Sequence, residues 1–211
     1  QAEDGIRDRD VTGVQTCALP ILENIKQLHE YGKLPISIYA LPEGTHVPVG
    51  VPMCTIFNTR PEFFWVTNLL ETYISCSLWQ SCTSATIAGL YRRRFERYAN
   101  QTVGNHNLVP YQGHDFSFRG MSSYESAMKS ALGHMLFFKG SDTVPIYDYI
   151  KRYYFNPVSA VSVPATEHSV MCMGGTDDEI STISRLLDIY PTGILSVVSD
   201  TWNYWNVLEN I

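Results

Sequence analysis

In the second half of the chain, several short apolar segments are each followed by side chains that can bind a ligand. They comprise acids, imidazoles, cations and one aromatic ring, namely His114, Asp115, Phe116, Arg119, Lys139, Asp142, Glu167, His168 and Asp200. Arg119 and Lys139 suit phosphate oxygens. Phe116 could stack on a flat heteroaromatic ring, and Asp142 could accept hydrogen bonds from an amide on that ring. These residue types indicate a site for a phosphorylated ligand.

Four of these residues also have an ordinary structural explanation. Phe116 suits a core position equally well, and Asp142 and Asp200 each precede an expected helix, where aspartate is a favoured N-cap. His168 suits an exposed or hydrogen-bonded histidine with no catalytic role. The spacing of the histidines fits no zinc motif, and HExxH and CxxC are absent, so we expect no transition-metal site. Walker A, GxGxxG and GxSxG motifs are absent as well.

The spacing of four of these residues predicts the elements that position them. Phe116, Asp142, His168 and Asp200 are 26, 26 and 32 positions apart (142 − 116, 168 − 142, 200 − 168), which suits successive strand–helix units. The carboxyl ends of parallel strands open on one face, where such folds gather ligand-binding groups. The fold class is therefore α/β. Four units make either half of an eight-stranded barrel or a complete small doubly wound sheet, and the pattern leaves both open.

Local patterns place the individual elements. We expect strands at 134–138, 160–163 and 194–198 and a helix near 146–154. Two capping boxes, Ser122 with Glu125 and Thr176 with Glu179, predict the starts of two further helices. Gly120 and Gly140 are expected to let the backbone approach its neighbours closely.

The preceding part of the chain has a different pattern. Apolar and polar residues alternate over residues 34–57, which also contain the turn-forming sequences Pro-Glu-Gly and Val-Gly. This pattern predicts short antiparallel strands joined by turns. Residues 61–98 are mostly helical in pattern, with four late arginines (92, 93, 94 and 97) that we interpret as an exposed helix face rather than a phosphate patch. We therefore expect a mixed strand and helix domain at 22–110 and the first units of the α/β part at 111–211.

Composition excludes several classes of protein. The 211 residues are 45% hydrophobic and 17% charged, enough apolar residues for a core. A net charge of −6 offers no broad basic surface for nucleic acid or anionic lipid. Apolar runs are too short for a spanning helix, and five cysteines without a CxxC pair favour a reduced, cytoplasmic setting.

Residues 1–21 stand apart from the rest of the sequence. They have no helix or strand period and do not fit a signal peptide. The segment resembles the in-frame translation of a sequencing-library adapter, so we interpret it as a non-native leader. The chain also stops within an apolar-periodic stretch at Ile211, and we expect residues 22–211 to be a central piece of a longer protein.

The strand-end segments also resemble a known family. HDFSFRGMSS (114–123), FKGSDTV (138–144), SVPATEHS (162–169) and SVVSD (196–200) are similar to successive blocks of the nicotinamide phosphoribosyltransferases. LPEG (41–44) and NTRPE (58–62) match as well. The similarity covers essentially all of residues 29–210, in order.

The resemblance implies a type II phosphoribosyltransferase. In that family an irregular α/β barrel lies beside a mixed domain, and the enzyme is a homodimer. The implied reaction joins nicotinamide to phosphoribosyl pyrophosphate, giving nicotinamide mononucleotide and pyrophosphate for NAD salvage. Mg²⁺ and ATP hydrolysis are implied with it.

The resemblance also implies residue roles. Phe116 matches the aromatic that stacks on nicotinamide, Arg119 an arginine that holds the ribose phosphate, and Asp142 the carboxylate that binds the carboxamide. His168 matches the histidine that is phosphorylated when ATP is spent. Ser162, Val163 and Ala165 match the family's pocket wall near the base. Asp200 matches an acid at a strand end.

Differences from the family leave three hypotheses. Segments that complete the family's site, including the later barrel strands, have no counterpart in residues 22–211, so we expect no turnover by the 211-residue chain alone. The first hypothesis is part of a nicotinamide phosphoribosyltransferase, the second a nicotinate phosphoribosyltransferase, and the third a short binding or regulatory module. Asp142 argues against the second, because a carboxylate repels the carboxylate of nicotinate.

Overall fold

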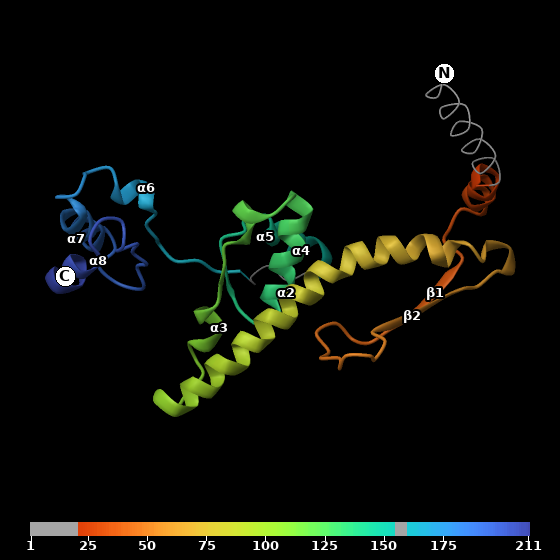
Figure 1. Ribbon diagram of the computed structural model, residues 1–211, viewed down its shortest axis with the longest axis horizontal. Coiled ribbons are helices and arrows are strands. Elements are labelled where there is room, and N and C mark those ends of the chain that lie inside the picture. Colours follow the sequence, from red (N-terminus) through yellow and green to blue (C-terminus); the bar gives the residue numbers. More distant parts are fainter. Residues whose placement is uncertain (1–20, 155–159) are drawn as a thin grey trace, which may run out of the picture. The chain divides into compact units, whose positions relative to one another are not determined.

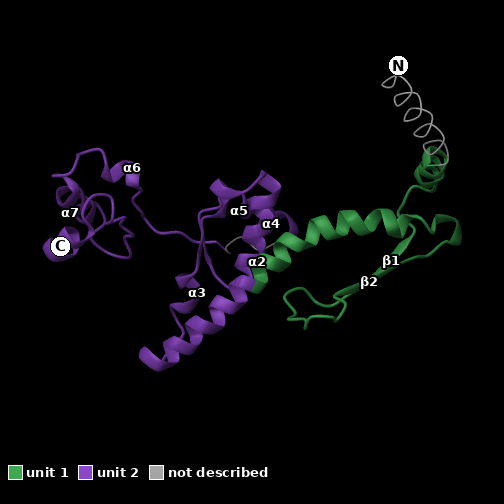
Figure 2. Cartoon of the chain, viewed as in Figure 1, with its two compact units in different colours: residues 1–86 green, residues 87–211 purple. Residues whose placement is uncertain are grey.

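The computed structural model describes residues 21–154 and 160–211 (Figure 1). The expected non-native leader lies outside the described residues except for its last position. The chain divides into two compact units, residues 1–86 and 87–211 (Figure 2). The domain boundary expected near residue 111 stays a prediction. None of the helices in the described residues is long and apolar enough to cross a membrane.

The first unit contains the expected antiparallel hairpin. Strands β1 (Ile36–Ala40) and β2 (Cys54–Asn58) pair with Ile38 opposite Ile56. The Pro-Glu-Gly turn lies in the loop between them, where Gly44 takes a φ of +81°, a left-handed conformation that suits glycine. The alternating pattern therefore predicted this hairpin correctly.

The long helix is also confirmed, with a later start. Pro61–Phe63 forms a separate 3-10 turn, η1, and α2 runs over Val66–Thr102. Late in α2, Arg92 donates hydrogen bonds to Glu96 and to the Phe137 carbonyl, each at 2.7 Å. The other three arginines of the cluster are exposed, as expected for a helix face.

The second unit is built on short parallel pairings. Strand β3 (His114–Asp115) pairs in parallel with β4 (Gly140–Ser141). Gly140 pairs in parallel with Val161, and further along Ala165 pairs with Ser196. These pairings join segments that follow one another in the chain and are separated by helices, which confirms the α/β fold class. The expectation of half a barrel stays a prediction.

The strand expected at 134–138 is wrong. Helix α4 covers Tyr124–Met135, so His134 and Met135 are helical, and the strand begins only at Gly140. A short apolar run suits a buried strand and a buried helix end equally well by pattern. The segments expected as strands at 160–163 and 194–198 contribute single bridges at Val161 and Ser196.

The helix starts differ slightly from the expected capping boxes. Helix α4 is capped by Ser123, whose side chain accepts the Ser126 N–H, instead of Ser122. Helix α7 (Glu179–Ile189) begins after Asp178, with no side-chain cap from Thr176. Residues 21–31 are helical as well. Further helical elements are α3 (Val109–Gln112), η2 (Ser117–Gly120), α5 (Ile146–Tyr154), α6 (His168–Met171) and α8 (Tyr204–Asn210).

Two small apolar clusters support the second unit. Ile146 and Ile150, four residues apart on α5, pack with Ala131 of α4 and with Ala160. Met171, Ile183 and Val207 join α6, α7 and α8. Buried positions at a spacing of three to four are what an amphipathic helix provides, so each cluster holds the helices that follow the strand ends.

Candidate active site

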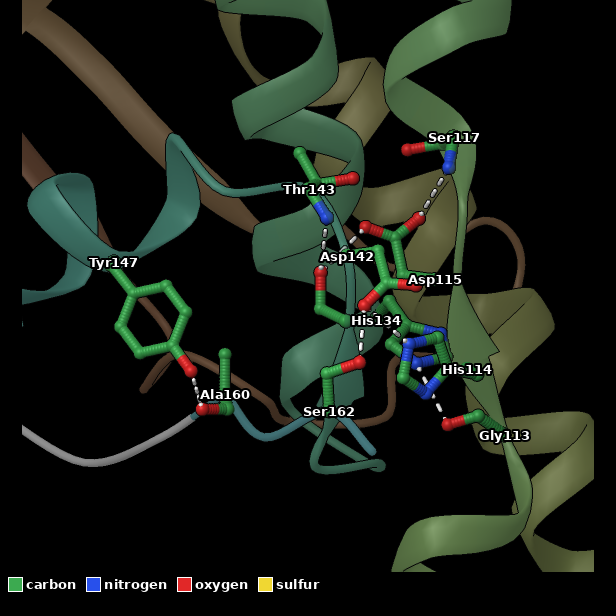
Figure 3. A network of polar contacts seen from close by, with 11 residues as sticks. Gly113, His114, Asp115, Ser117, His134, Asp142, Thr143, Tyr147, Ala160 and Ser162 are labelled. Atoms are coloured by element: carbon green, nitrogen blue, oxygen red, sulfur yellow. Dashed lines mark hydrogen bonds and ion pairs between the residues drawn. The ribbon is translucent and has the colours of Figure 1, made fainter. Parts of the chain in front are cut away.

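The carboxylate of Asp142 follows β4 directly and lies within a polar cluster (Figure 3). Its Oδ1 accepts a hydrogen bond from the Ser162 hydroxyl at 2.5 Å and lies 3.2 Å from Nε2 of His114. That nitrogen makes no well-aligned hydrogen bond to any described residue, so its contact with Asp142 is a close approach rather than a hydrogen bond. The Asp142 side chain remains 38% exposed. The acid is held from one side and open to a ligand on the other.

The alternative that Asp142 caps a helix is wrong. Helix α5 begins at Ile146, four residues later, and the Asp142 carboxylate is engaged by Ser162 and His114. Its position is therefore set by neighbouring strand ends.

Phe116 follows β3 and lies beside this cluster. Its ring centroid is 4.6 Å from that of His114, with an angle of 36° between the planes. Phe116 is 59% exposed, so the alternative that it belongs to the core is wrong. An exposed ring next to an acid offers a stacking surface and an acceptor to one planar ligand.

Gly140 permits the close packing of His114. A Cβ at position 140 would overlap Nδ1 of His114 and lie 3.2 Å from the Gly113 carbonyl oxygen. A Cβ on Gly120 would meet no described atom within 4 Å. The close backbone approach expected at the two glycines stays a prediction.

At the end of β3 and at the end of β4, a side-chain oxygen accepts a backbone N–H two residues later and so closes a turn. Oδ1 of Asp115 accepts the Ser117 N–H at 3.1 Å, and Oγ of Ser141 accepts the Thr143 N–H at 3.1 Å. Each bond spans two residues and closes a turn around the residue between them. The Ser141 hydroxyl donates to Oδ2 of Asp115 at 3.1 Å, which joins the two turns.

His134 of α4 supports this region from behind. Its Nε2 lies 3.3 Å from the Gly113 carbonyl, and its ring stacks on Phe138 with centroids 5.1 Å apart. Burial lowers the pKa of His134, because the charged ring loses solvation, and the nearby Asp115 carboxylate opposes this only in part. Its neutral ring is a packing group whose Nε2–H can donate to the Gly113 carbonyl.

The two cations of the site differ in their surroundings. Arg119, in η2, has its Nη1 3.9 Å from Oε1 of Glu167, and both side chains are mostly exposed. Such a loose pair contributes little energy, so the Arg119 guanidinium can reorganise around a phosphate. Lys139 places Nζ 5.6 Å above the ring of Tyr111, a cation–π contact.

His168 and Asp200 form a second polar pair. Nε2 of His168 lies 3.0 Å from Oδ1 of Asp200, and both side chains are more than half exposed. A carboxylate that accepts from Nε2–H leaves the Nδ1 lone pair of the ring free. Asp200 does not cap α8, whose N-cap is Asn203, so that alternative is wrong.

The three pocket-wall residues follow the Val161 bridge. Ser162 donates to Asp142, Val163 is 38% exposed, and Ala165 pairs with Ser196. This segment leads from Asp142 to His168 at the start of α6.

The α/β part of the chain matches a family model. Residues 111–210 match the model described as the nicotinate phosphoribosyltransferase (NAPRTase) family. These 100 residues are similar to that family. The match includes every strand end described above.

Curated relatives of the chain carry a narrower name. A protein of Acinetobacter baylyi named nicotinamide phosphoribosyltransferase is 51% identical over 190 residues, which is 89% of this chain and 38% of the relative. Proteins of the same name from Mycoplasma pneumoniae and Mycoplasma genitalium are 37% and 35% identical, over 90% and 87% of this chain. The chain spans 38–40% of the length of these relatives.

The structure brings the predicted site residues together in groups. Phe116 and Asp142 lie against His114, Ser162 donates to Asp142, and His168 pairs with Asp200. Their roles toward a ligand stay predictions. The sequence did not single out Ser117, Ser141 and Thr143 as supports. A signal existed, since Asp and Ser side chains often close a turn by accepting the backbone N–H two residues later.

A protein cage for a metal ion does not occur in the described residues, where no group of three or more His, Cys, Asp or Glu side chains could hold one. Mg²⁺ commonly takes one or two carboxylates and completes its shell with water and substrate phosphates. The Mg²⁺ and ATP that the resemblance implies therefore stay predictions.

Proposed function

We propose that this chain forms the base-binding part of a nicotinamide phosphoribosyltransferase. The enzyme would join the ring nitrogen of nicotinamide to C1 of phosphoribosyl pyrophosphate. The C1–oxygen bond to pyrophosphate breaks as the new carbon–nitrogen bond forms, and pyrophosphate leaves with the bonding electron pair. The products are nicotinamide mononucleotide and pyrophosphate.

The geometry at Asp142 carries this proposal. The contacts of its carboxylate with Ser162 and His114 both reach Oδ1. Among the described residues, no hydrogen bond reaches Oδ2, which is therefore available to a carboxamide NH₂. Phe116 lies beside the same His114, so one face of a pyridine ring can stack while its amide reaches the acid.

The remaining site residues supply positioning and charge. Arg119, paired only loosely with Glu167 at 3.9 Å, would hold the phosphate of the ribose. Holding both substrates in line contributes to the rate by positioning, and cations near the departing pyrophosphate stabilise its charge.

His168 is the proposed link to ATP. Its Nδ1 would attack the γ-phosphorus of ATP, forming a nitrogen–phosphorus bond while ADP departs. Asp200, 3.0 Å from Nε2, would stabilise the ring as it becomes positive. Phosphohistidine would appear in the ³¹P spectrum after incubation with ATP and Mg²⁺, and the signal would be absent from His168→Ala.

Nicotinate phosphoribosyl transfer is the second candidate, because the matching family model carries that name. The two bases differ in one group, an amide against a carboxylate. Asp142 attracts the first and repels the second.

Further segments that complete the site belong to the proposal, because the curated relatives are more than twice as long as the matched region. A homodimer is proposed from the family resemblance alone.

A competition assay tests the proposed function. The complete open reading frame that contains this sequence is supplied with phosphoribosyl pyrophosphate, Mg²⁺, ATP and equal amounts of both bases. Nicotinamide mononucleotide should be the dominant product. Predominant nicotinate mononucleotide would favour the second candidate, and neither product would contradict both.

A further inference from the structure

The two residues proposed to hold the base, Phe116 and Asp142, occupy equivalent places in two linked turns. Figure 3 shows Asp115 and Ser117 of the first turn and Asp142 and Thr143 of the second. Phe116 lies between Asp115 and Ser117, whose side-chain-to-backbone bond closes the first turn. Asp142 lies between Ser141 and Thr143, whose bond closes the second. Each ligand-binding side chain is therefore presented from the tip of a turn.

The two turns share one buried carboxylate. Asp115 is 7% exposed and Ser141 is 3% exposed, and they face each other in the register of β3 and β4. Oδ1 of Asp115 binds its own turn, while Oδ2 accepts the Ser141 hydroxyl at 3.1 Å. The main chain adds a third tie, because the Asp142 N–H donates to the Asp115 carbonyl at 2.9 Å.

We propose that Asp115 is a positioning residue that sets the placement of the Phe116 ring relative to the Asp142 carboxylate. This inference rests on the proposed function for its effect on nicotinamide, but the geometry it describes exists without a ligand. Asp115 acts through two hydrogen bonds that fix neighbouring turns, and it contacts no substrate. Positioning of this kind matters because a base is bound well only when its ring and its amide are met together.

The chemistry of the two bonds predicts an order among variants. Asp115→Ala loses both bonds of Asp115: the first turn loses the bond that closes it, and the Ser141 hydroxyl that closes the second turn loses its partner. Asp115→Asn keeps an oxygen for the Ser117 N–H, and its amide can donate to Ser141, whose oxygen can accept that bond and the Thr143 N–H together. Ser141→Ala keeps the first turn and frees only the second. The KM for nicotinamide is therefore expected to rise in the order wild type, Asp115→Asn, Ser141→Ala, Asp115→Ala.

Steady-state kinetics on the complete open reading frame test the positioning role. Asp115→Ala should raise the KM for nicotinamide about tenfold, the size expected from losing two hydrogen bonds, with the KM for phosphoribosyl pyrophosphate unchanged within about twofold. Asp115→Asn should restore most of the loss. Asp188→Asn, an exposed aspartate on α7, is the matched control and should behave as wild type.

Amide hydrogen exchange on the 211-residue chain provides a readout that needs no catalysis. The amides of Ser117 and Thr143 should both be protected in the wild type and both exchange faster in Asp115→Ala, whereas Ser141→Ala should release Thr143 alone. If Asp115→Ala does not fold, Ser141→Ala and Asp115→Asn still decide the question.

Each outcome has one meaning. Unchanged protection of Ser117 and Thr143 in a folded Asp115→Ala chain would overturn the proposal, as would an equal rise in the KM values of both substrates. Coupled loss of protection in an enzyme that transfers neither base would support the positioning role and contradict the proposed function alone.

Discussion

Gly140 lies directly against the imidazole ring of His114, leaving no room for a side chain. A Cβ at position 140 would overlap Nδ1 of His114 and press on the Gly113 carbonyl. The same ring contacts Asp142 and Phe116. The small size of Gly140 therefore allows the His114 ring to lie between the two residues proposed to bind the base.

Gly140→Ala should therefore displace the His114 ring and weaken nicotinamide binding. Inserting a methyl group into such a packed position costs about 1–3 kcal/mol, part of which should appear as a severalfold rise in the dissociation constant measured by calorimetry. Gly120→Ala is the matched control, because a Cβ there meets nothing within 4 Å. Equal affinity in the two variants would show that the His114 position has no influence on the base.

Asp142→Asn should reduce the preference for nicotinamide over nicotinate. The substitution keeps the shape of the side chain but removes the charge that repels a carboxylate, and it adds an NH₂ that can donate to one. We expect about a tenfold or larger fall in the ratio of kcat/KM values, which corresponds to about 1.4 kcal/mol. An unchanged ratio would remove Asp142 from the role proposed here.

His134 should make folding stability depend on pH. Burial lowers its folded pKa below the ordinary 6.5, so below about that pH the unfolded chain binds more protons than the folded one. Stability should fall as the pH decreases from 6.5 toward the folded pKa and should be insensitive to this group above 6.5.

Urea unfolding at about pH 7.5 and about pH 5.5 measures this effect. His134→Gln should lose less stability between the two conditions than the wild type does. His46→Gln, a change at an exposed histidine of the hairpin loop, should keep the wild-type pH response. If His134→Gln retains it too, the dependence originates elsewhere.

Ile146→Ala should destabilise the second unit strongly. Ile146 is fully buried in the cluster with Ala131, Ile150 and Ala160, and truncation leaves a cavity that costs about 2–5 kcal/mol. Denaturant unfolding monitored by circular dichroism gives the value. Val144→Ala, at a side chain that is 71% exposed, should change stability by less than about 0.5 kcal/mol. Similar losses in both variants would argue against this core.

Local patterns predicted the α/β class, the hairpin, the long helix and the strand-end residues. They did so because turns, helix periodicity and residue chemistry depend on neighbours in sequence. The same patterns assigned His134 and Met135 to a strand, although both belong to α4. A run of five apolar or aromatic residues has no period that separates a strand from a helix end.

The sequence by itself determined which chemical groups stand at the strand ends: the ring of Phe116, the acids at 142 and 200, and the imidazole of His168. Only the tertiary structure decided which of them meet. Asp142 joins His114 and Ser162, and the buried Asp115–Ser141 bond links the turns that carry Phe116 and Asp142. These partners are 20 to 28 positions apart (162 − 142, 142 − 114), so their contacts depend on strand register, which short segments do not encode locally.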